Sequence, residues 1–387
     1  MATSGATALY VHWPFCKAKC PYCDFNSHVS TSVDHPRWAD QLKRELDHMA
    51  ALSERRGQVL SSIFFGGGTP SLMAPETMAS VINHAAEVFH FAPDIEITME
   101  ANPTSVEAEK LAAFRGSGAN RLSMGIQSLR REALAFLGRE HSADEAMDAL
   151  ALARELFPRV SADFIYARPQ QTEAEWQAEL EEILALGLDH LSLYQLTLEP
   201  GTAFYSQHQR GMLDLPHDDM ARGFYDLTQS LTAASGCPAY EVSNHAARGQ
   251  ESQHNLMYWS AGDWLGIGPG AYGRFWRDGK RVETRSRRAP QSWLDDVTRQ
   301  GHAIDQLTHD EPLDYAHEAM MMGLRLTRGV DLTRVEHYAG PRAHWLNLAL
   351  LDQLAEDGLI TMTDDHLSLT AKGQPVLNAI LGGVLIT

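Results

Sequence analysis

The strongest constraint on the fold is a regular alternation of short apolar segments with helical ones over the first half of the chain. Apolar runs bounded by turn signals predict strands, and the longer amphipathic stretches between them predict helices. We expect strands over residues 8–12, 62–65, 94–100, 121–126, 160–166 and 190–196. We expect helices over 36–55, 75–89, 106–117, 143–156, 173–185 and 218–235. Such βα units form a parallel sheet with right-handed crossovers. Six units are too few for the closed eight-stranded TIM barrel, so the sequence predicts an α/β fold with an open, partial (β/α)6 TIM-like barrel.

The second half of the chain departs from this alternation. A stretch rich in glycine and aromatic residues comes first, and three helical segments, two short strands around an Asp-Asp turn and a last helix follow. That order of elements is typical of a winged-helix-like unit. We therefore expect a partial barrel (1–240), a segment that packs on the barrel (241–305) and a C-terminal helical, winged-helix-like domain (306–387).

The charge balance restricts the partners. The chain carries 50 acidic and 32 basic residues, which gives a net charge of -18. Binding of nucleic acid relies on basic patches, so we expect no nucleic-acid partner. No apolar run is long enough to span a bilayer, and no signal peptide is evident. Four cysteines, three of them clustered, do not make a disulfide framework, and we expect a location in the reduced cytoplasm.

Three cysteines near the start of the chain, Cys16, Cys20 and Cys23, have the spacing C-x-x-x-C-x-x-C. Iron–sulfur cubanes are normally held by four thiolates. Three closely spaced thiolates can hold three corners of a cubane and leave one iron open to chelate a small molecule. The alternatives are a zinc site or three ordinary buried thiols. Zinc usually takes four ligands on paired C-x-x-C arms, and the remaining cysteine, Cys237, is far away in sequence.

Polar residues fall at or near the carboxyl ends of the expected strands. They are Glu100, Gln127, Asp163 and Gln195. The cysteine loop and a run of three glycines, 66–68, also follow strands directly. Glycine has no Cβ and lets the backbone approach a ligand closely. Because active sites of parallel α/β barrels gather at this edge, we expect one shared binding site there.

The cysteine spacing resembles that of radical S-adenosylmethionine (SAM) proteins. Within them the chain is similar to the oxygen-independent coproporphyrinogen oxidase family. The similar stretches are Tyr10-Val11-His12-Trp13-Pro14-Phe15-Cys16, the glycine run with Thr69-Pro70, Met99-Glu100-Ala101-Asn102-Pro103, Ser123-Met124-Gly125-Ile126-Gln127-Ser128 and residues 266–273. The resemblance implies a [4Fe-4S] cluster on the three cysteines and SAM on its open iron. The residues at positions where the family contacts SAM are Tyr10, Tyr22, Gly67, Gly68, Thr69, Glu100, Gln127, Arg139 and Asp163.

Within that family the chain most resembles the heme-chaperone branch. The oxidase branch carries one more cysteine two residues after the third ligand, where this chain has Phe25. The oxidase branch also has a long segment before the cluster loop, and here only a few residues precede Tyr10. Residues 254–259 read H-N-x-x-Y-W, the motif that the chaperone branch uses for heme. The residues expected to contact heme are His254, Asn255, Tyr258 and Trp259.

Imidazole is a common axial ligand of heme iron, which makes His254 the expected ligand and His245 a second candidate. The resemblance implies that heme is passed to an acceptor hemoprotein, either cytoplasmic or a membrane-associated respiratory protein. Two other activities stay open, namely the decarboxylation of coproporphyrinogen III and the radical opening of the heme ring. The sequence leaves open whether SAM is cleaved.

Two further stretches need separate interpretation. Residues 268–273 match G-x-G-x-x-G but lack the βαβ context of a dinucleotide site, so we expect a tight loop that lines a pocket. After the strand that bears Asp163, the family often reads Gly-Leu-Pro, whereas this chain has Ala167-Arg168-Pro169. The behaviour of this loop therefore does not carry over from the family.

Overall fold

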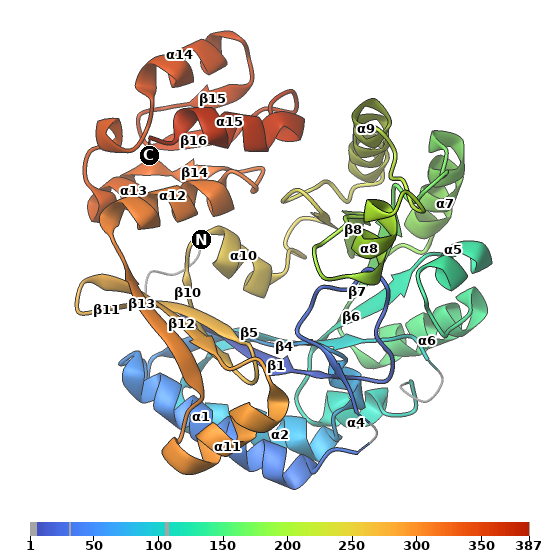
Figure 1. The fold of residues 1–387 in the computed structure, drawn as a ribbon, viewed down its shortest axis with the longest axis vertical. Coiled ribbons are helices and arrows are strands. Elements are labelled where there is room, and N and C mark those ends of the chain that lie inside the picture. The colour runs from blue at the N-terminus through green and yellow to red at the C-terminus, as the bar shows by residue number, and fades with distance from the viewer. Residues whose placement is uncertain (1–5, 31, 105–107, 387) are drawn as a thin grey trace.

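One large sheet forms the centre of the molecule. The computed structural model describes residues 6–30, 32–104 and 108–386. Over these residues eleven strands pair in the order β13-β12-β11-β10-β1-β4-β5-β6-β7-β8-β9 (Figure 1). Six of them are parallel and follow chain order: β1 (Thr7–Trp13), β4 (Val59–Gly67), β5 (His90–Ala101), β6 (Arg121–Gln127), β7 (Arg159–Tyr166) and β8 (His190–Gln195). The sheet stays open, and the prediction of an open, partial (β/α)6 barrel is confirmed.

Helices connect the parallel strands and cover their outer face. They are α1 (His35–Leu52), α2 (Pro75–Val88), α4 (Leu111–Gly116), α5 (Arg131–Phe136), α6 (Ala143–Leu156) and α7 (Glu173–Ala185). The strands alternate in the way this layer requires: Leu9 and Val11 of β1 lie in the main hydrophobic core, and the Tyr10 ring stacks on Phe64 on the inner face. The first residues of the helix expected over 106–117 lie outside the described residues.

The segment 241–305 adds strands to the same sheet at both edges. β9 (Asn244–Ala246) pairs antiparallel with β8, and β10 (Asp263–Ile267) pairs in parallel with β1. β11 (Tyr272–Arg277), β12 (Lys280–Ser286) and β13 (Ile304–Asp310) then extend the sheet antiparallel. In Figure 1, α1, α2 and α11 (Pro290–Gln300) lie below the strands, and α10 (Gln253–Trp259) lies above them. Helix α10 therefore occupies the inner face of the partial barrel.

The stretch that matches G-x-G-x-x-G forms the tight turn between β10 and β11. An antiparallel strand follows it, and φ is +98° at Gly268 and +78° at Gly270. A Cβ at Gly268 would lie 2.3 Å from the carbonyl oxygen of His12, and one at Gly270 would lie 2.7 Å from Nδ2 of Asn26. The prediction of a tight loop is confirmed. The turn packs against the cysteine loop and does not line the large cavity described below, because its backbone is pressed against His12 and Asn26.

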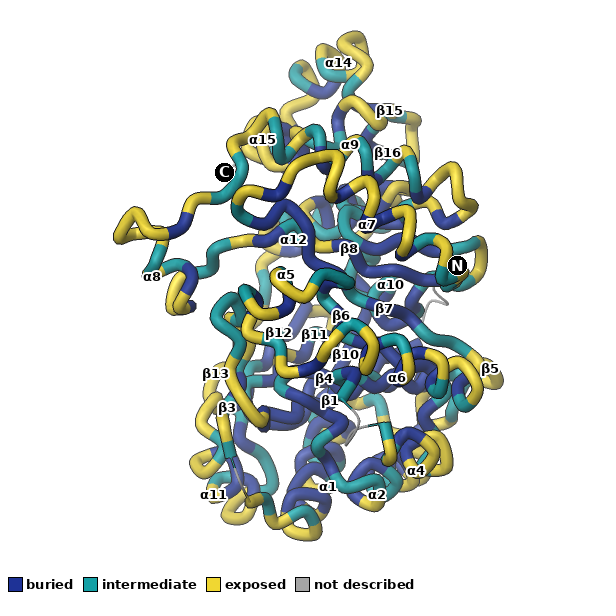
Figure 2. Tube along the Cα trace, turned by 90° about the vertical axis from the view of Figure 1, so that its right-hand side faces the viewer, coloured by how far each residue is buried: buried dark blue, intermediate teal, exposed yellow. Residues whose placement is uncertain are grey.

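The C-terminal unit has its own small core. Its elements are α12 (Pro312–Gly323), β14 (Val330–Asp331), α13 (Leu332–Ala339), α14 (Leu348–Glu356), β15 (Ile360–Met362), β16 (His366–Leu369) and α15 (Leu377–Val384). The three strands pair in the order β14-β16-β15, and Met320, Leu332 and Leu367 are buried together. Helices followed by a small hairpin confirm the winged-helix-like prediction. Figure 2 shows buried residues along the strands and exposed residues on outer helices and loops.

None of the helices in the described part of the chain combines the length and the apolar composition needed to cross a membrane.

Candidate functional site

A cavity of about 1140 Å³ opens at the carboxyl ends of the parallel strands. The cysteine loop, the ends of β5 to β8 and one side of the C-terminal unit form its walls. The predicted site residues that line it are Cys16, Cys20, Tyr22, Cys23, Gly68, Thr69, Glu100, Gln127, Arg139, Asp163 and Gln195. The structure thus brings together most of the residues that the strand pattern and the resemblance singled out. Tyr10, Gly67 and the H-N-x-x-Y-W residues are not among the lining residues.

The three cysteines lie on one wall of the cavity. Cys16 is buried at the end of β2 (Phe15–Cys16), and Cys20 and Cys23 are half-buried in the loop that follows. The Thr69 hydroxyl donates to the Cys16 Sγ at 3.4 Å, and the Arg139 guanidinium donates to the Cys20 Sγ at 3.6 Å. Burial raises the pKa of the Cys16 thiol, and the hydrogen bond from Thr69 partly offsets this effect by favouring the thiolate, the form that binds metal.

The donor set fits a cluster held at three corners. Among the described residues, no group of three His, Cys, Asp or Glu side chains is placed to hold a single metal ion. A cubane has a different requirement, because each thiolate binds a different iron and the sulfurs need not converge on one point. Three thiols facing one cavity, two of them with hydrogen-bond donors, meet that requirement.

The cysteine loop is supported from below by side chains of the inner barrel face. The Tyr10 hydroxyl donates to His12 Nδ1 at 3.0 Å, and His12 Nε2 donates to the Asn26 carbonyl oxygen at 2.9 Å. Asn26 Nδ2 in turn donates to the Pro269 and Arg288 carbonyl oxygens. Burial lowers the pKa of His12 to about 4, so the ring is neutral as this relay requires. Tyr10, expected at the SAM site, therefore supports the cysteine loop from a deeper position.

The glycine run is required by the packing of the chain itself. Gly67 has φ +110°, and a Cβ there would lie 2.4 Å from the His12 ring. A Cβ on Gly68 would lie 2.7 Å from the Phe15 carbonyl oxygen. The backbone of the run therefore touches the cysteine strand, and Gly67 is free to donate its N–H to Glu100 Oε2 at 3.2 Å.

Two half-buried carboxylates, Glu100 and Asp163, face the cavity. Burial, and secondly the charge of Asp163, raises the pKa of Glu100 to about 8. Burial also raises the pKa of Asp163, whose two oxygens accept from the Ser123 hydroxyl at 3.2 and 3.3 Å. Two carboxylates that repel each other in a half-buried site favour a ligand with positive charge, because such a ligand stabilises both ionised forms.

Arg139 and Gln127 complete the wall between the carboxylates and the cysteines. Arg139 Nη2 donates to Asn102 Oδ1 at 2.5 Å and to the Gly125 carbonyl oxygen at 2.9 Å. Gln127 ends β6 with φ +71°, a left-handed conformation that is uncommon outside glycine and clusters at functional sites. Sequence reasoning missed the roles of Asn102 and Ser123, although both lie in stretches quoted for the family resemblance.

The loop that departs from the family pattern is held by a buried ion pair. Ala167 has φ +56°, the left-handed region that favours glycine. Arg168 is buried and pairs with Glu179 Oε2 at 2.7 Å. The same guanidinium donates to the Ser128 hydroxyl and to the Ile165 carbonyl oxygen, so it ties the ends of β6 and β7 together below the cavity.

Replacing Arg168 by the family's leucine is expected to destabilise this chain. The change leaves the Glu179 carboxylate buried with only two donors, the Ser128 hydroxyl and the Leu129 N–H. We expect Arg168→Leu to lower the free energy of unfolding by about 2–3 kcal/mol in urea denaturation. The neighbouring Arg130–Glu182 pair is exposed to solvent. Arg130→Leu is therefore expected to lower the free energy of unfolding by less than about 1 kcal/mol. Equal effects of the two variants would contradict the prediction.

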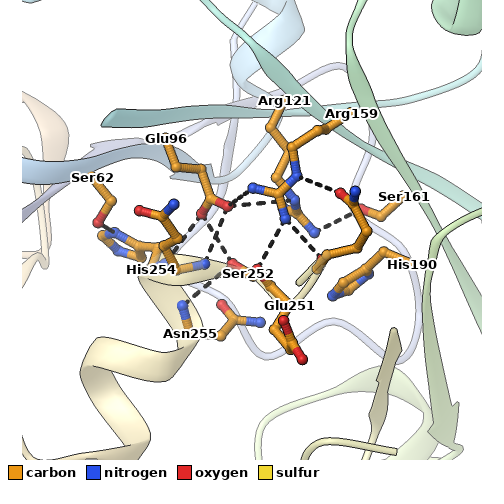
Figure 3. Close-up of polar contacts among 12 residues, drawn as sticks. Ser62, Glu96, Arg121, Arg159, Ser161, His190, Glu251, Ser252, His254 and Asn255 are labelled. Carbon is orange, nitrogen blue, oxygen red and sulfur yellow. Dashed lines mark hydrogen bonds and ion pairs between the residues drawn. The ribbon is translucent and has the colours of Figure 1, made fainter. Parts of the chain in front are cut away.

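The H-N-x-x-Y-W helix is anchored inside the barrel (Figure 3). Glu96 of β5 accepts hydrogen bonds from the Ser252 hydroxyl at 3.2 Å and from the N–H groups of Gln253 and His254 at 3.1 Å each. Arg159 donates to the same carboxylate at 2.7 Å and to the carbonyl oxygens of residues 250 and 251. Glu96 and Arg159 therefore both hold the start of α10 in place.

Each residue of the motif contacts a different part of the protein. His254 is 1% exposed; its Nδ1 lies 2.9 Å from the Ser62 hydroxyl, and its Nε2 lies 2.7 Å from the Tyr258 hydroxyl. Asn255 Nδ2 donates to the Tyr240 hydroxyl at 3.4 Å. The Trp259 ring lies under the Arg325 guanidinium at 5.1 Å. The structure thus keeps both ring nitrogens of His254 occupied.

Comparisons with known proteins agree with this arrangement. A model of the radical SAM superfamily matches residues 10–183, and one of the HemN C-terminal domain matches residues 310–376. The chain is 39% identical to radical S-adenosyl methionine domain-containing protein 1, mitochondrial, of Bos taurus, over 99% of this chain and 88% of that protein. It is 36% identical to the heme chaperone HemW of Escherichia coli, over 97% of both. Coproporphyrinogen III oxidase (HemN) from Escherichia coli, described as a radical SAM enzyme, has a similar structure: the TM-score is 0.81 at 25% identity, over 98% of this chain and 89% of that one.

Proposed function

The chain belongs to the radical SAM superfamily and to the family of the heme chaperone HemW, and on this premise we propose that it binds heme and passes it to an acceptor hemoprotein. The observation that carries the proposal is the similarity to HemW over nearly the whole length of both chains. Phe25, at the place where the oxidase branch has a further cysteine, lines the cavity and favours the chaperone over coproporphyrinogen decarboxylation.

We assign the cluster to Cys16, Cys20 and Cys23 and SAM to the cavity beside them. Cys16, Cys20 and Cys23 would hold a cluster that, once reduced by an external one-electron donor, would supply one electron to the sulfonium of SAM, so that one C–S bond would break and give methionine and a 5′-deoxyadenosyl radical. Glu100 and Asp163 accept hydrogen bonds from the amine or the hydroxyls of SAM and balance its positive charge. With a pKa of about 8, the Glu100 carboxyl group is mostly protonated at pH 7. Because a cation favours the ionised carboxylate, the binding of SAM at pH 7 releases this proton. The Gly68 backbone and the Thr69 side chain close the wall behind the ligand.

We assign heme binding to the H-N-x-x-Y-W helix, with His254 as the iron ligand. Burial lowers the pKa of His254 to about 3, so its imidazole is neutral at pH 7, the form that coordinates iron. Coordination through Nε2 requires this nitrogen to leave the Tyr258 hydroxyl, and heme access requires α10 to move from the inner barrel face. The proposal therefore includes a rearrangement of α10 on heme binding.

Heme titration of three variants tests this assignment. We expect His254→Ala to weaken heme binding by at least about tenfold and to change the Soret spectrum, because the axial ligand is lost. We expect Tyr258→Phe to strengthen binding by about fivefold, since the change frees Nε2 from one hydrogen bond of about 1 kcal/mol. His245→Ala replaces the second candidate ligand, which is also buried; we expect it to bind heme like the wild type, and weaker binding by this variant alone would assign the iron to His245. Equal heme binding by the wild type and His254→Ala would overturn the ligand assignment.

The acceptor hemoprotein and the cytoplasmic location are further parts of the proposal. They are supported by the chaperone names of the relatives and by the reduced thiols that a cluster requires. Loaded chain mixed with extracts that contain apo-hemoproteins is expected to lose its heme Soret band as the acceptor gains one.

A further inference from the structure

The C-terminal unit contributes one arginine to the wall of the large cavity. Arg325 follows α12, lines the cavity and faces it together with residues 374–378 of the same unit. The Tyr225 hydroxyl of α9 (Asp218–Ala234) donates to Gln374 Oε1 at 3.0 Å and holds this wall against the barrel. Arg325 therefore lies where the barrel and the C-terminal unit meet across the cavity.

The Arg325 guanidinium is held in place but is not neutralised by an ion pair. It lies over the Trp259 ring at 5.1 Å, a contact that orients a cation without satisfying its N–H groups. Over the described residues Arg325 takes part in no ion pair, and its Nε is buried without a hydrogen-bond partner. Glu241 lies close enough for the Arg325 charge to oppose the rise in its pKa that burial causes, but no ion pair joins the two among the described residues, and Glu241 Oε1 accepts from the Ser243 N–H and the Asn244 amide.

Three other cations on the cavity wall have partners, whereas Lys19, which also lines the cavity, is exposed to solvent and so needs none. Arg139 donates to Asn102 and Gly125, Arg222 pairs with Asp226 at 2.7 Å, and Lys17 pairs with Glu140 at 2.7 Å. Arginine presents its donors in a planar fork that matches a carboxylate. A buried donor without a partner in a cavity wall therefore points to an anionic group on a ligand.

The size of the cavity leaves room for a ligand besides SAM. At about 1140 Å³ it exceeds the roughly 300–1,000 Å³ typical of a site for one small molecule. The carboxylate of SAM is expected at the open iron beside the cysteines, and Arg325 belongs to the wall of the C-terminal unit. Heme carries two propionate carboxylates on one edge of an otherwise apolar ring, and the guanidinium that the Trp259 ring supports belongs to the cavity wall.

We propose that Arg325 binds a propionate carboxylate of heme through its guanidinium, beside Trp259, and so anchors the polar edge of the heme at the junction of the cavity and α10. This inference rests on the proposed heme-binding function and adds a residue that neither the motif nor the family resemblance indicates. Trp259 acts here as a positioning residue for the guanidinium.

The test compares heme with its dimethyl ester, in which both carboxylates are masked. The two ligands are titrated in the same detergent into the full-length wild type, Arg325→Gln, Arg325→Lys and, as a matched control, Arg328→Gln. Arg328 is exposed, lies three residues further along and donates to the Ser260 hydroxyl. We expect Arg325→Gln to weaken the binding of heme by about tenfold, the loss expected for one charged hydrogen bond, and to leave the binding of the ester unchanged. Arg325→Lys should recover part of the loss, and Arg328→Gln should bind both ligands like the wild type.

The outcomes separate this inference from the proposed function. Wild type that binds heme and ester equally, or Arg325→Gln that weakens both equally, would overturn the role of Arg325 while heme binding stands. Wild type that binds neither ligand would remove both proposals. Weaker SAM binding by Arg325→Gln, with heme binding intact, would assign the carboxylate to SAM and overturn the inference. The comparison of the two ligands on the wild type needs no variant and remains decisive if Arg325→Gln does not fold.

Discussion

Replacing Cys20 by alanine is expected to remove the iron–sulfur cluster from the chain. A cluster held at three corners has no spare protein ligand, so losing one thiolate leaves at most two. After anaerobic reconstitution, we expect iron and sulfide contents to fall from about four of each per chain to near zero. We expect SAM-dependent 5′-deoxyadenosine release under strong reduction to disappear with them. Cys20 is the best choice of the three because it is half-buried, whereas replacing the buried Cys16 would also disturb packing.

The chain contains its own control for this experiment. Cys237 is buried, its Sγ lies 3.9 Å from the Asp189 carbonyl oxygen, and it does not line the cavity. Cys237→Ala is therefore expected to keep the cluster and its response to SAM. A full four-iron cluster in Cys20→Ala, or the loss of the cluster in Cys237→Ala, would show that the three-cysteine assignment is wrong.

Local sequence signals predict the parallel core of this fold well. Helices α6 and α7 begin and end where the pattern places them, because capping boxes at Ser142 and Thr172 fix their starts. Each parallel strand was expected within a few residues of its observed bounds. These elements depend on residues close in sequence, which is the information that a periodicity carries.

The edges of the sheet depend on pairings that no local pattern reports. β10 pairs with β1 in parallel, with Leu265 beside Leu9, although more than two hundred residues separate them in the sequence. The glycine-rich turn after β10 could be recognised as a tight loop, but its packing against His12 and Asn26 appears only once both strands are in place. For this reason local sequence patterns could not predict that strands of segment 241–305 join the main sheet.

The sequence predicted which strand ends meet at the candidate site, but it did not predict which inner-face residues reach the cavity and which lie below it. Strand ends gather at one edge of a parallel sheet, so Glu100, Gln127 and Asp163 could be assigned to one cavity from sequence. Tyr10 lies on the same inner face, yet its register beside Phe64 and Gly266 puts it below the cavity, against His254. Which inner residues reach the cavity depends on register and on what fills the barrel, here α10, and neither follows from spacing.

Two glutamates of β5, the buried Glu96 and the half-buried Glu100, have opposite electrostatic roles. Burial raises the pKa of Glu96, but the Arg121 and Arg159 charges and the hydrogen bonds from two backbone N–H groups together lower it more, so its pKa lies below the ordinary value. Glu100, four residues along the strand, has no ion pair among the described residues, and burial followed by the Asp163 charge raises its pKa to about 8. The folded protein thus favours the ionised form of Glu96 and the protonated form of Glu100. Substituting each by the isosteric glutamine separates these roles.

Glu96→Gln is expected to lower the free energy of unfolding at pH 7 by about 3–5 kcal/mol, because it leaves the buried Arg121 and the half-buried Arg159 without their counter-charge and loosens the start of α10. The stabilisation by Glu96 is present above the pKa of the unfolded chain, about 4.3, and is lost as the pH falls through the lower folded pKa. Glu100→Gln is expected to be neutral below about pH 4 and increasingly stabilising from there toward pH 8, because the unfolded wild type loses the Glu100 proton near pH 4.3 whereas the folded wild type keeps it up to about pH 8. Urea denaturation of both variants at pH 5, 7 and 8 checks the signs. A loss of stability in Glu100→Gln equal to that in Glu96→Gln would show that both carboxylates act only through packing.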